Sequence, residues 1–205
     1  MQRAGGFSLI EMAIVLAVIS LIAAAMLMTG SSLFGRAGMA SLLASVKDLA
    51  AASREFKVRY SYFPGDLLNA GNYISGAGCS GNGNGIVDTE PESNCALEHL
   101  VKAGMLRGID YDPASSRYAI AINNWGTGTR VSLWFDSTSN VNAVRVSNLP
   151  CDVALEIERK LDSATSGNTP FIEGSVRARN AADAPIQTCV PGAANDPVAA
   201  LLIRY

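Results

Sequence analysis

The sequence contains few of the residues on which metal binding and catalysis commonly depend. Its only histidine is His99, and none of its four cysteines belongs to a Cys-x-x-Cys pair. These shortages exclude histidine-rich metal sites and argue against zinc knuckles, thioredoxin-type redox sites and histidine-dependent catalysis. An excess of one charge is also missing, because 16 Lys and Arg face 18 Asp and Glu for a net charge of −2. The chain is therefore neither a strongly basic nucleic-acid binder nor an acidic tail.

Apolar residues are concentrated near the start of the 205-residue chain. Between Met12 and Met28 they are interrupted only by Ser20, and no comparable run follows. A helix over residues 7–29 would be about 34 Å long, which is enough to cross a bilayer core of about 30 Å. We therefore expect a transmembrane or filament-core helix segment at residues 7–34 and one extracytoplasmic globular domain at residues 35–205.

A secretory signal peptide is one interpretation of this N-terminus. It would use Arg3 as its positive region and the alanines at residues 23–25 as its cleavage site. Glu11 argues against it, because a carboxylate driven to the middle of the membrane costs about 2.5 kcal/mol or more. Cleavage after Ala25 would also leave three large apolar residues at the new terminus.

Residues 5–11, Gly-Gly-Phe-Ser-Leu-Ile-Glu, favour a second interpretation. They resemble the class III leader of type IV pilins and type II secretion pseudopilins. The resemblance implies that a prepilin peptidase removes residues 1–6 by cutting after Gly6, and that Phe7 becomes an N-methylated first residue. Glu11 matches the glutamate usual at the fifth position of the processed chain, where the resemblance implies pairing with the Phe7 amine of a neighbouring subunit. A Glu11 carboxylate at the lipid headgroup level is the alternative.

The expected fold class is α+β. Apolar side chains recur at spacings of three and four after residue 38, which predicts one long helix over residues 7–60 with a single buried stripe. The stripe consists of Met39, Leu42, Val46, Leu49, Ser53, Phe56 and Tyr60. Pro64 and Gly65 are expected to end this helix. Packing it on an antiparallel sheet gives a two-layer domain, and the resemblance implies the same pilin-like architecture.

The other elements are expected to be short. A Gly- and Asn-rich loop is predicted at residues 69–94, followed by helices at residues 94–105 and 152–161. Strands are predicted as a meander at residues 117–122, 129–135 and 141–147, with further strands at 171–178 and 198–203.

The four cysteines can pair in three ways. Local pairing would join Cys79 to Cys95 across the loop, and Cys151 to Cys189 across the C-terminal region. Each bridge would contribute about 2–4 kcal/mol, and an extracytoplasmic domain lies in a compartment that permits disulfides. Buried free thiols are the alternative.

The Gly- and Asn-rich loop partly resembles a calcium-binding loop. Its candidate ligands are Asn82, Asn84, Asp88 and Glu90. The pattern departs from a calcium loop, because Ser80 would occupy its first position and Pro91 its twelfth. A turn held by a disulfide is the preferred interpretation, with calcium as the alternative, and no cofactor is required.

The remaining candidate residues are interpreted as structural. His99 has no carboxylate or nucleophile placed beside it by the sequence. Trp125 and Trp134 are expected to pack against the sheet. The basic residues near the end of the long helix are expected to lie on a solvated face, because the overall charge is acidic.

The sequence therefore predicts a structural protein and not an enzyme. We expect a subunit of a type IV pilus or related pseudopilus, polymerised through its N-terminal helix. Its partners would be further copies, other pilin-like subunits, prepilin peptidase and an inner-membrane assembly platform. It would be a single-pass inner-membrane protein before assembly and a periplasmic or extracellular filament afterwards. A type II secretion pseudopilin, a DNA-uptake pseudopilin and a non-polymerising anchored binding module are the alternatives; nucleic acid is a partner only in the DNA-uptake case.

Overall fold

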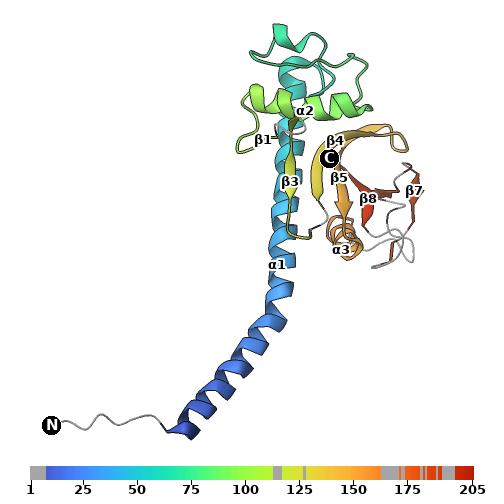
Figure 1. The fold of residues 1–205 in the computed structure, drawn as a ribbon. Coiled ribbons are helices and arrows are strands. Elements are labelled where there is room, and N and C mark those ends of the chain that lie inside the picture. The colour runs from blue at the N-terminus through green and yellow to red at the C-terminus, as the bar shows by residue number, and fades with distance from the viewer. Residues whose placement is uncertain are drawn as a thin grey trace, which may run out of the picture.

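In the part of the chain that the structure describes, a long helix, α1, carries a body made of two shorter helices, a 3-10 turn and two antiparallel sheets (Figure 1). The computed structural model describes residues 8–112, 117–126, 128–162, 171, 174–180, 182, 184–187, 189–190 and 197–205, without the side chains of residues 25–36. The body lies beside the second half of α1, and the first half extends away from it (Figure 1).

Helix α1 spans Leu9–Tyr60, which is 52 residues or about 78 Å. The prediction of one continuous helix up to residue 60 is confirmed. The predicted stop signal is wrong, because the helix ends before Pro64 is reached. Ser61 adopts the left-handed conformation at φ 63°, and its N–H donates to the carbonyl of Lys57, which is a common way to end a helix.

The second half of α1 buries the stripe that the spacing predicts. Met39, Leu42, Val46, Leu49, Ser53 and Phe56 are all buried. This face of the helix packs against strands β3 (Ile120–Ile122), β4 (Thr129–Asp136) and β5 (Val141–Leu149). The two layers expected for an α+β domain are therefore present.

The shorter helices differ in part from their predicted bounds. A 3-10 turn occupies Ala70–Asn72 inside the predicted loop, and helix α2 spans Glu90–Lys102, four residues ahead of its predicted start. Thr89 caps α2 by accepting the N–H of Glu92 at 3.3 Å, and Pro91 lies in the first turn, where its missing N–H loses no helical bond. Helix α3, Cys151–Leu161, agrees with the prediction to within one residue.

The strands form two sheets in the described part of the chain. A two-stranded sheet pairs β1 (Tyr111–Asp112) with β2 (Arg117–Tyr118). The larger sheet has the order β3-β4-β5-β8-β6-β7, with β6 at Val176–Arg179, β7 at Pro185–Ile186 and β8 at Val198–Arg204. The predicted meander is confirmed as β3-β4-β5. The predicted strand at residues 117–122 is instead divided between the two sheets, and that at 171–178 is reduced to β6.

The register of the large sheet separates an apolar face from a polar one. Val131 of β4 pairs with Val146 of β5, which pairs in turn with Leu201 of β8, and all three side chains are buried against the helices. The next residues along the same strands point the other way. Arginine is frequent among them: Arg130, Arg145, Arg177, Arg179 and Arg204 share the polar face.

Candidate processing and assembly site

The N-terminal end of α1 carries the residues that the leader resemblance singles out. Gly6 and Phe7 lie outside the described residues. The Ser8 hydroxyl accepts the N–H of Ile10 at 3.4 Å, and the Glu11 carboxylate accepts the N–H of Ser8 at 3.4 Å. These two bonds form a capping box, which brings the carboxylate to the positive end of the helix dipole. Glu11 is thereby directed toward the predicted cleavage site.

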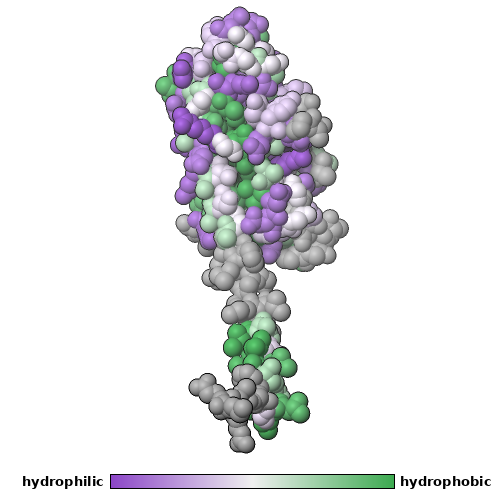
Figure 2. Space-filling view, turned by 60° about the vertical axis from the view of Figure 1, so that its left-hand side comes forward, coloured by the Kyte–Doolittle hydropathy of each residue, from purple (hydrophilic) through white to green (hydrophobic). Residues whose placement is uncertain are grey.

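Apolar side chains are exposed along the described first half of α1. Leu9 is 91% exposed and Leu21 is 72% exposed. Figure 2 shows green, hydrophobic residues gathered at the lower end of the helix, below a body whose visible face mixes purple and white residues with a central green stripe. A continuous apolar surface of this kind marks contact with a membrane or a protein partner. Among the helices as far as they are described, none is long and apolar enough to cross a membrane.

Two disulfides fix the body. Of the three possible pairings, the structure forms the local one, with Cys79 bonded to Cys95 and Cys151 bonded to Cys189. The first joins the Gly- and Asn-rich loop to α2. The second ties a segment beyond β7 to the first residue of α3.

Two buried carboxylates organise the Gly- and Asn-rich loop. Asp66 accepts the N–H of Asn84 and the N–H of Gly85, each at 2.9 Å, and Glu92 accepts the N–H of Asn82 at 3.3 Å. Burial raises the pKa of the Asp66 carboxyl, while its bonds to backbone N–H groups act in the opposite direction. The loop that precedes α2 therefore folds around one side chain from the turn after α1 and one from the first turn of α2.

Three of the four candidate calcium ligands use their side chains in other contacts. Asn82 accepts the N–H of Asn84 at 2.9 Å, and Asn84 accepts the N–H of Ile86 at 3.0 Å. Glu90 lies in the first turn of α2 rather than in the loop, and its carboxylate is 2.9 Å from Nη1 of Arg145. Calcium binding by these residues and Asp88 stays a prediction, which the engaged amide oxygens do not favour.

His99 lies where α2 meets the end of α1 and the Gly- and Asn-rich loop. It is fully buried, and its ring stacks on that of Phe56 with centroids 5.9 Å apart and planes inclined by 8°. Its Nε2 is 3.1 Å from both the Cys79 carbonyl oxygen and Cys95 Sγ. The imidazole and both sulfurs come close together, but a disulfide leaves the sulfurs without the thiolate that a metal requires. A structural role for His99 agrees with this geometry.

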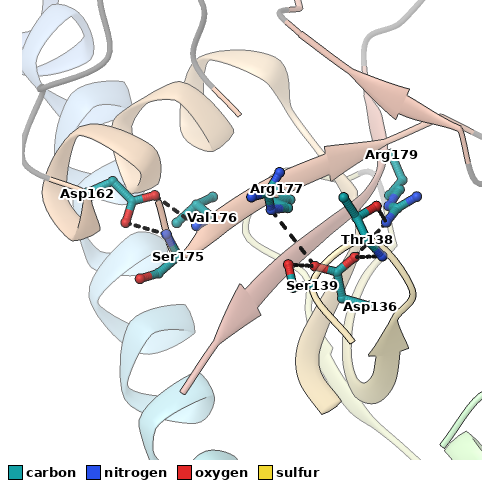
Figure 3. Close-up of polar contacts among 8 residues, drawn as sticks. All are labelled: Asp136, Thr138, Ser139, Asp162, Ser175, Val176, Arg177 and Arg179. Atoms are coloured by element: carbon teal, nitrogen blue, oxygen red, sulfur yellow. Dashed lines mark hydrogen bonds and ion pairs between the residues drawn. The ribbon is translucent and has the colours of Figure 1, made fainter. Parts of the chain in front are cut away.

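Asp136, at the end of β4, joins two distant strands of the large sheet. Its carboxylate lies 2.6 Å from Nη2 of Arg179, on β6, and also accepts the Ser139 hydroxyl at 2.5 Å and the N–H of Thr138 at 3.1 Å (Figure 3). Burial acts to raise the pKa of Asp136, but these bonds together lower it below its ordinary value. Because β5 and β8 lie between β4 and β6, a flat sheet would separate the strands by about 14 Å. The contact therefore requires the sheet to curl, with its polar face inside.

A second aspartate holds the other end of β6. Asp162, which follows α3, accepts the N–H groups of Ser175 and Val176 at 2.7 and 2.8 Å (Figure 3). From the sequence, Asp66 is interpreted as a turn or cap residue, and Asp136 and Asp162 are not singled out as site residues. Asp136 bonds to Thr138 and Ser139 within its own turn. The other partners described here lie 13 to 43 positions away from the aspartate that they contact.

Comparison with known proteins assigns the N-terminus. Residues 1–27 match the family model of the prokaryotic N-terminal methylation motif. Neither the curated proteins nor the solved structures give a match to the chain. The matched residues include Gly6, Phe7, Glu11 and most of the apolar run. The chain thus begins with the class III prepilin leader of type IV pilins and pseudopilins.

Proposed function

We propose that the chain is a structural subunit of a type IV pilus or a related pseudopilus filament. The methylation motif supports cleavage after Gly6 and N-methylation of Phe7 by prepilin peptidase. The observation that carries the proposal is the exposed apolar surface between Leu9 and Ile22 of α1, whose described side chains take no part in the core of the body. The motif is typical of structural proteins, so we propose no enzymatic activity.

Before it polymerises, the proposed subunit is anchored in the inner membrane. The apolar run from Met12 to Met28 is held there, with the body on the extracytoplasmic side. Two disulfides fit that oxidising side. On assembly, the helix moves from lipid into a core of identical or related helices. Head-to-tail contacts of this kind do not close on themselves, so they produce a filament.

Glu11 is the residue that makes this transfer specific. A carboxylate surrounded by apolar helices requires a partner of opposite charge. Removal of residues 1–6 creates such a partner, the ammonium group of Phe7, one turn before Glu11 in the sequence. We propose that Glu11 of one subunit neutralises the Phe7 amine of its neighbour.

Glu11→Ala tests this assembly step, with Glu55→Ala, an exposed glutamate on the same helix, as the matched control. The fraction of protein in sheared filaments is measured by immunoblot, and processing is measured by intact mass of the membrane form. We expect Glu11→Ala to be cleaved and methylated at Phe7 but to be missing from filaments, while Glu55→Ala behaves as wild type. Normal incorporation of Glu11→Ala would refute the pairing.

A Gly6→Val variant separates the filament subunit from an anchored module that never polymerises. The β-branched side chain should block cleavage and leave the chain starting at Met1. A filament subunit then loses its function together with processing. Retained function in the uncleaved variant would instead identify a non-polymerising binding module.

A further inference from the structure

A trough of about 700 Å³ lies on the concave polar face of the large sheet. Its floor includes Ser132 and Trp134 of β4 and Ser147 of β5, and one wall is formed by the first two turns of α2. Helix α2 can lie there because it covers the edge of β4 that the short strand β3 leaves open, where Ser93 donates to the carbonyl of Leu133 at 2.7 Å. The volume is typical of sites for small ligands, which range over about 300–1,000 Å³.

Positive charge is in excess in the trough. Arg117, Arg130 and Arg145 line it, and Glu90 is the one carboxylate among its lining residues as described. The Arg130 side chain is exposed and forms no ion pair with a described residue. The Nε–H of Arg117 is buried and has no acceptor in the described structure. Nη1 of the same residue already donates to Oδ1 of Asn94 at 3.0 Å, so Arg117 has only part of its guanidinium available to a ligand.

Arg145 is held rigidly at the centre of the trough. Its Nη1 is 2.9 Å from Glu90, its Nε donates to Ser132 at 3.2 Å, and its guanidinium carbon lies 4.0 Å from the centre of the Trp134 ring. The stacked and paired guanidinium therefore holds one position before any ligand arrives, which lowers the entropy cost of binding.

Neutral polar groups surround these charges. The hydroxyl of Ser147 and the amide of Asn148 are among the lining groups, as is the amide of Asn94, whose oxygen accepts from Nη1 of Arg117 at 3.0 Å. The hydroxyls of Ser93 and Ser132 and the amide oxygen of Asn180 also line the trough, but they form hydrogen bonds within the protein. Amides and hydroxyls both donate and accept hydrogen bonds. The trough therefore matches a ligand that presents hydroxyl groups as well as negative charge.

We propose that this trough binds a saccharide chain that carries carboxylate groups. Guanidinium groups recognise carboxylates through paired charge-assisted hydrogen bonds. The Ser147 hydroxyl and the amides of Asn94 and Asn148 bond to sugar hydroxyls, and the Glu90 carboxylate accepts from them. A nucleic acid fits less well, because Arg145 covers one face of the Trp134 ring and so reduces the ring surface on which a base could stack.

Binding of trigalacturonate to the full chain, solubilised in a detergent without sugar groups, tests the proposal by calorimetry. Galactotriose, which has the same ring and linkage without the carboxylate, is the ligand control. We expect trigalacturonate to bind and galactotriose to bind at least about tenfold more weakly, since each charge-assisted bond is lost with the carboxylate. Absence of trigalacturonate binding, or equal binding of the two trisaccharides, would overturn the proposal.

Arg130→Gln locates the site, because this side chain can be changed without breaking an ion pair among the described residues. We expect its affinity for trigalacturonate to fall about tenfold, while Arg159→Gln, an exposed arginine on α3 behind the sheet, binds as wild type. Equal losses in both variants would place binding elsewhere. Triglutamate and a thymidine oligonucleotide of equal charge serve as further probes. If either binds as tightly as trigalacturonate and responds to Arg130→Gln, the saccharide assignment is wrong.

Discussion

The backbone N–H of Gly65 donates to Nδ1 of His99 at 3.0 Å, which makes this ring nitrogen an acceptor and leaves the ring proton on Nε2. The bond links the turn that follows α1 to the last turn of α2. Through its stacking on Phe56 and its contact with the Cys79 carbonyl, the same imidazole connects the long helix to the first disulfide. The neutral His99 ring, on α2, thus contacts three other segments: helix α1, the turn that follows it, and the loop that carries Cys79.

Protonation of His99 at acidic pH should lower the free energy of unfolding of the body. Burial lowers the pKa of His99 below its ordinary value of about 6.5, against the opposing effect of its bond to the Cys79 carbonyl. The unfolded chain therefore takes up the proton first. The free energy of unfolding should be unaffected by this group above pH 6.5 and fall as the pH drops from there toward the folded pKa. Because the chain has one histidine, its NMR titration measures that pKa without ambiguity.

His99→Gln isolates this contribution. The variant should be less stable than wild type at pH 8, and the difference between the two should shrink between pH 6.5 and pH 5. Asp66 contributes in the opposite sense at lower pH, because its raised pKa makes the folded form the better proton acceptor just above 3.8. Because wild type and His99→Gln both contain Asp66, the difference between their free energies of unfolding is free of the Asp66 contribution. A constant difference at all pH values would contradict a titrating role for His99.

Asp136→Asn should destabilise the curled sheet. The change removes the negative charge beside Arg179, which is 4% exposed, while it keeps the size of the side chain. Loss of one partner of a buried ion pair costs about 3–5 kcal/mol, so we expect a loss of about 3 kcal/mol in denaturant unfolding. Glu156→Gln, which removes an exposed ion pair with Lys160 at 3.2 Å, is the control and should change stability by less than about 0.5 kcal/mol. Similar effects of the two changes would show that Asp136 does not hold the sheet closed.

Gly81→Ala should disturb the Gly- and Asn-rich loop. A Cβ at this position would lie 2.3 Å from the Asp66 Cα, and backbone atoms cannot move aside as a flexible side chain can. We expect a loss of about 2–3 kcal/mol in the free energy of unfolding. At Gly71 the nearest atom to such a Cβ is the Ala77 carbonyl oxygen at 3.7 Å, so Gly71→Ala should stay within about 0.5 kcal/mol of wild type. Equal denaturant midpoints for the two variants would show that the loop does not pack tightly on Asp66.

Local patterns in the sequence predicted the parts of this fold that depend on nearby residues. The spacing of Leu42, Val46 and Leu49 identifies the buried face of α1, because a helix repeats its surface every 3.6 residues. The meander β3-β4-β5 was predicted for a similar reason, since each strand lies next to its sequence neighbour. The local pairing of the cysteines was one of three arrangements that the spacing left open.

Contacts between distant residues could not be predicted in this way. Strand β8 enters between β5 and β6, so the position of β6 in the sheet depends on a strand about 20 residues later. Asp136 and Arg179 are separated by 43 positions, and nothing in either segment identifies the other. The start of α2 was predicted four residues late, because the Gly- and Asn-rich loop was extended to residue 94, although proline is favourable in the first turn of a helix.

The position of β8 in the sheet determines when, during synthesis, the body can finish folding. Every other strand of the large sheet precedes it in the sequence, yet β8 supplies the hydrogen bonds between the meander and β6, and Tyr205, just after it, bonds to Ser53 of α1 at 2.8 Å. A chain emerging N-terminus first therefore cannot complete this sheet until residues 198–205 have also emerged. The body must mature after synthesis of the whole domain, so a translation product that stops before β8 would present open strand edges to the quality-control proteases of its compartment.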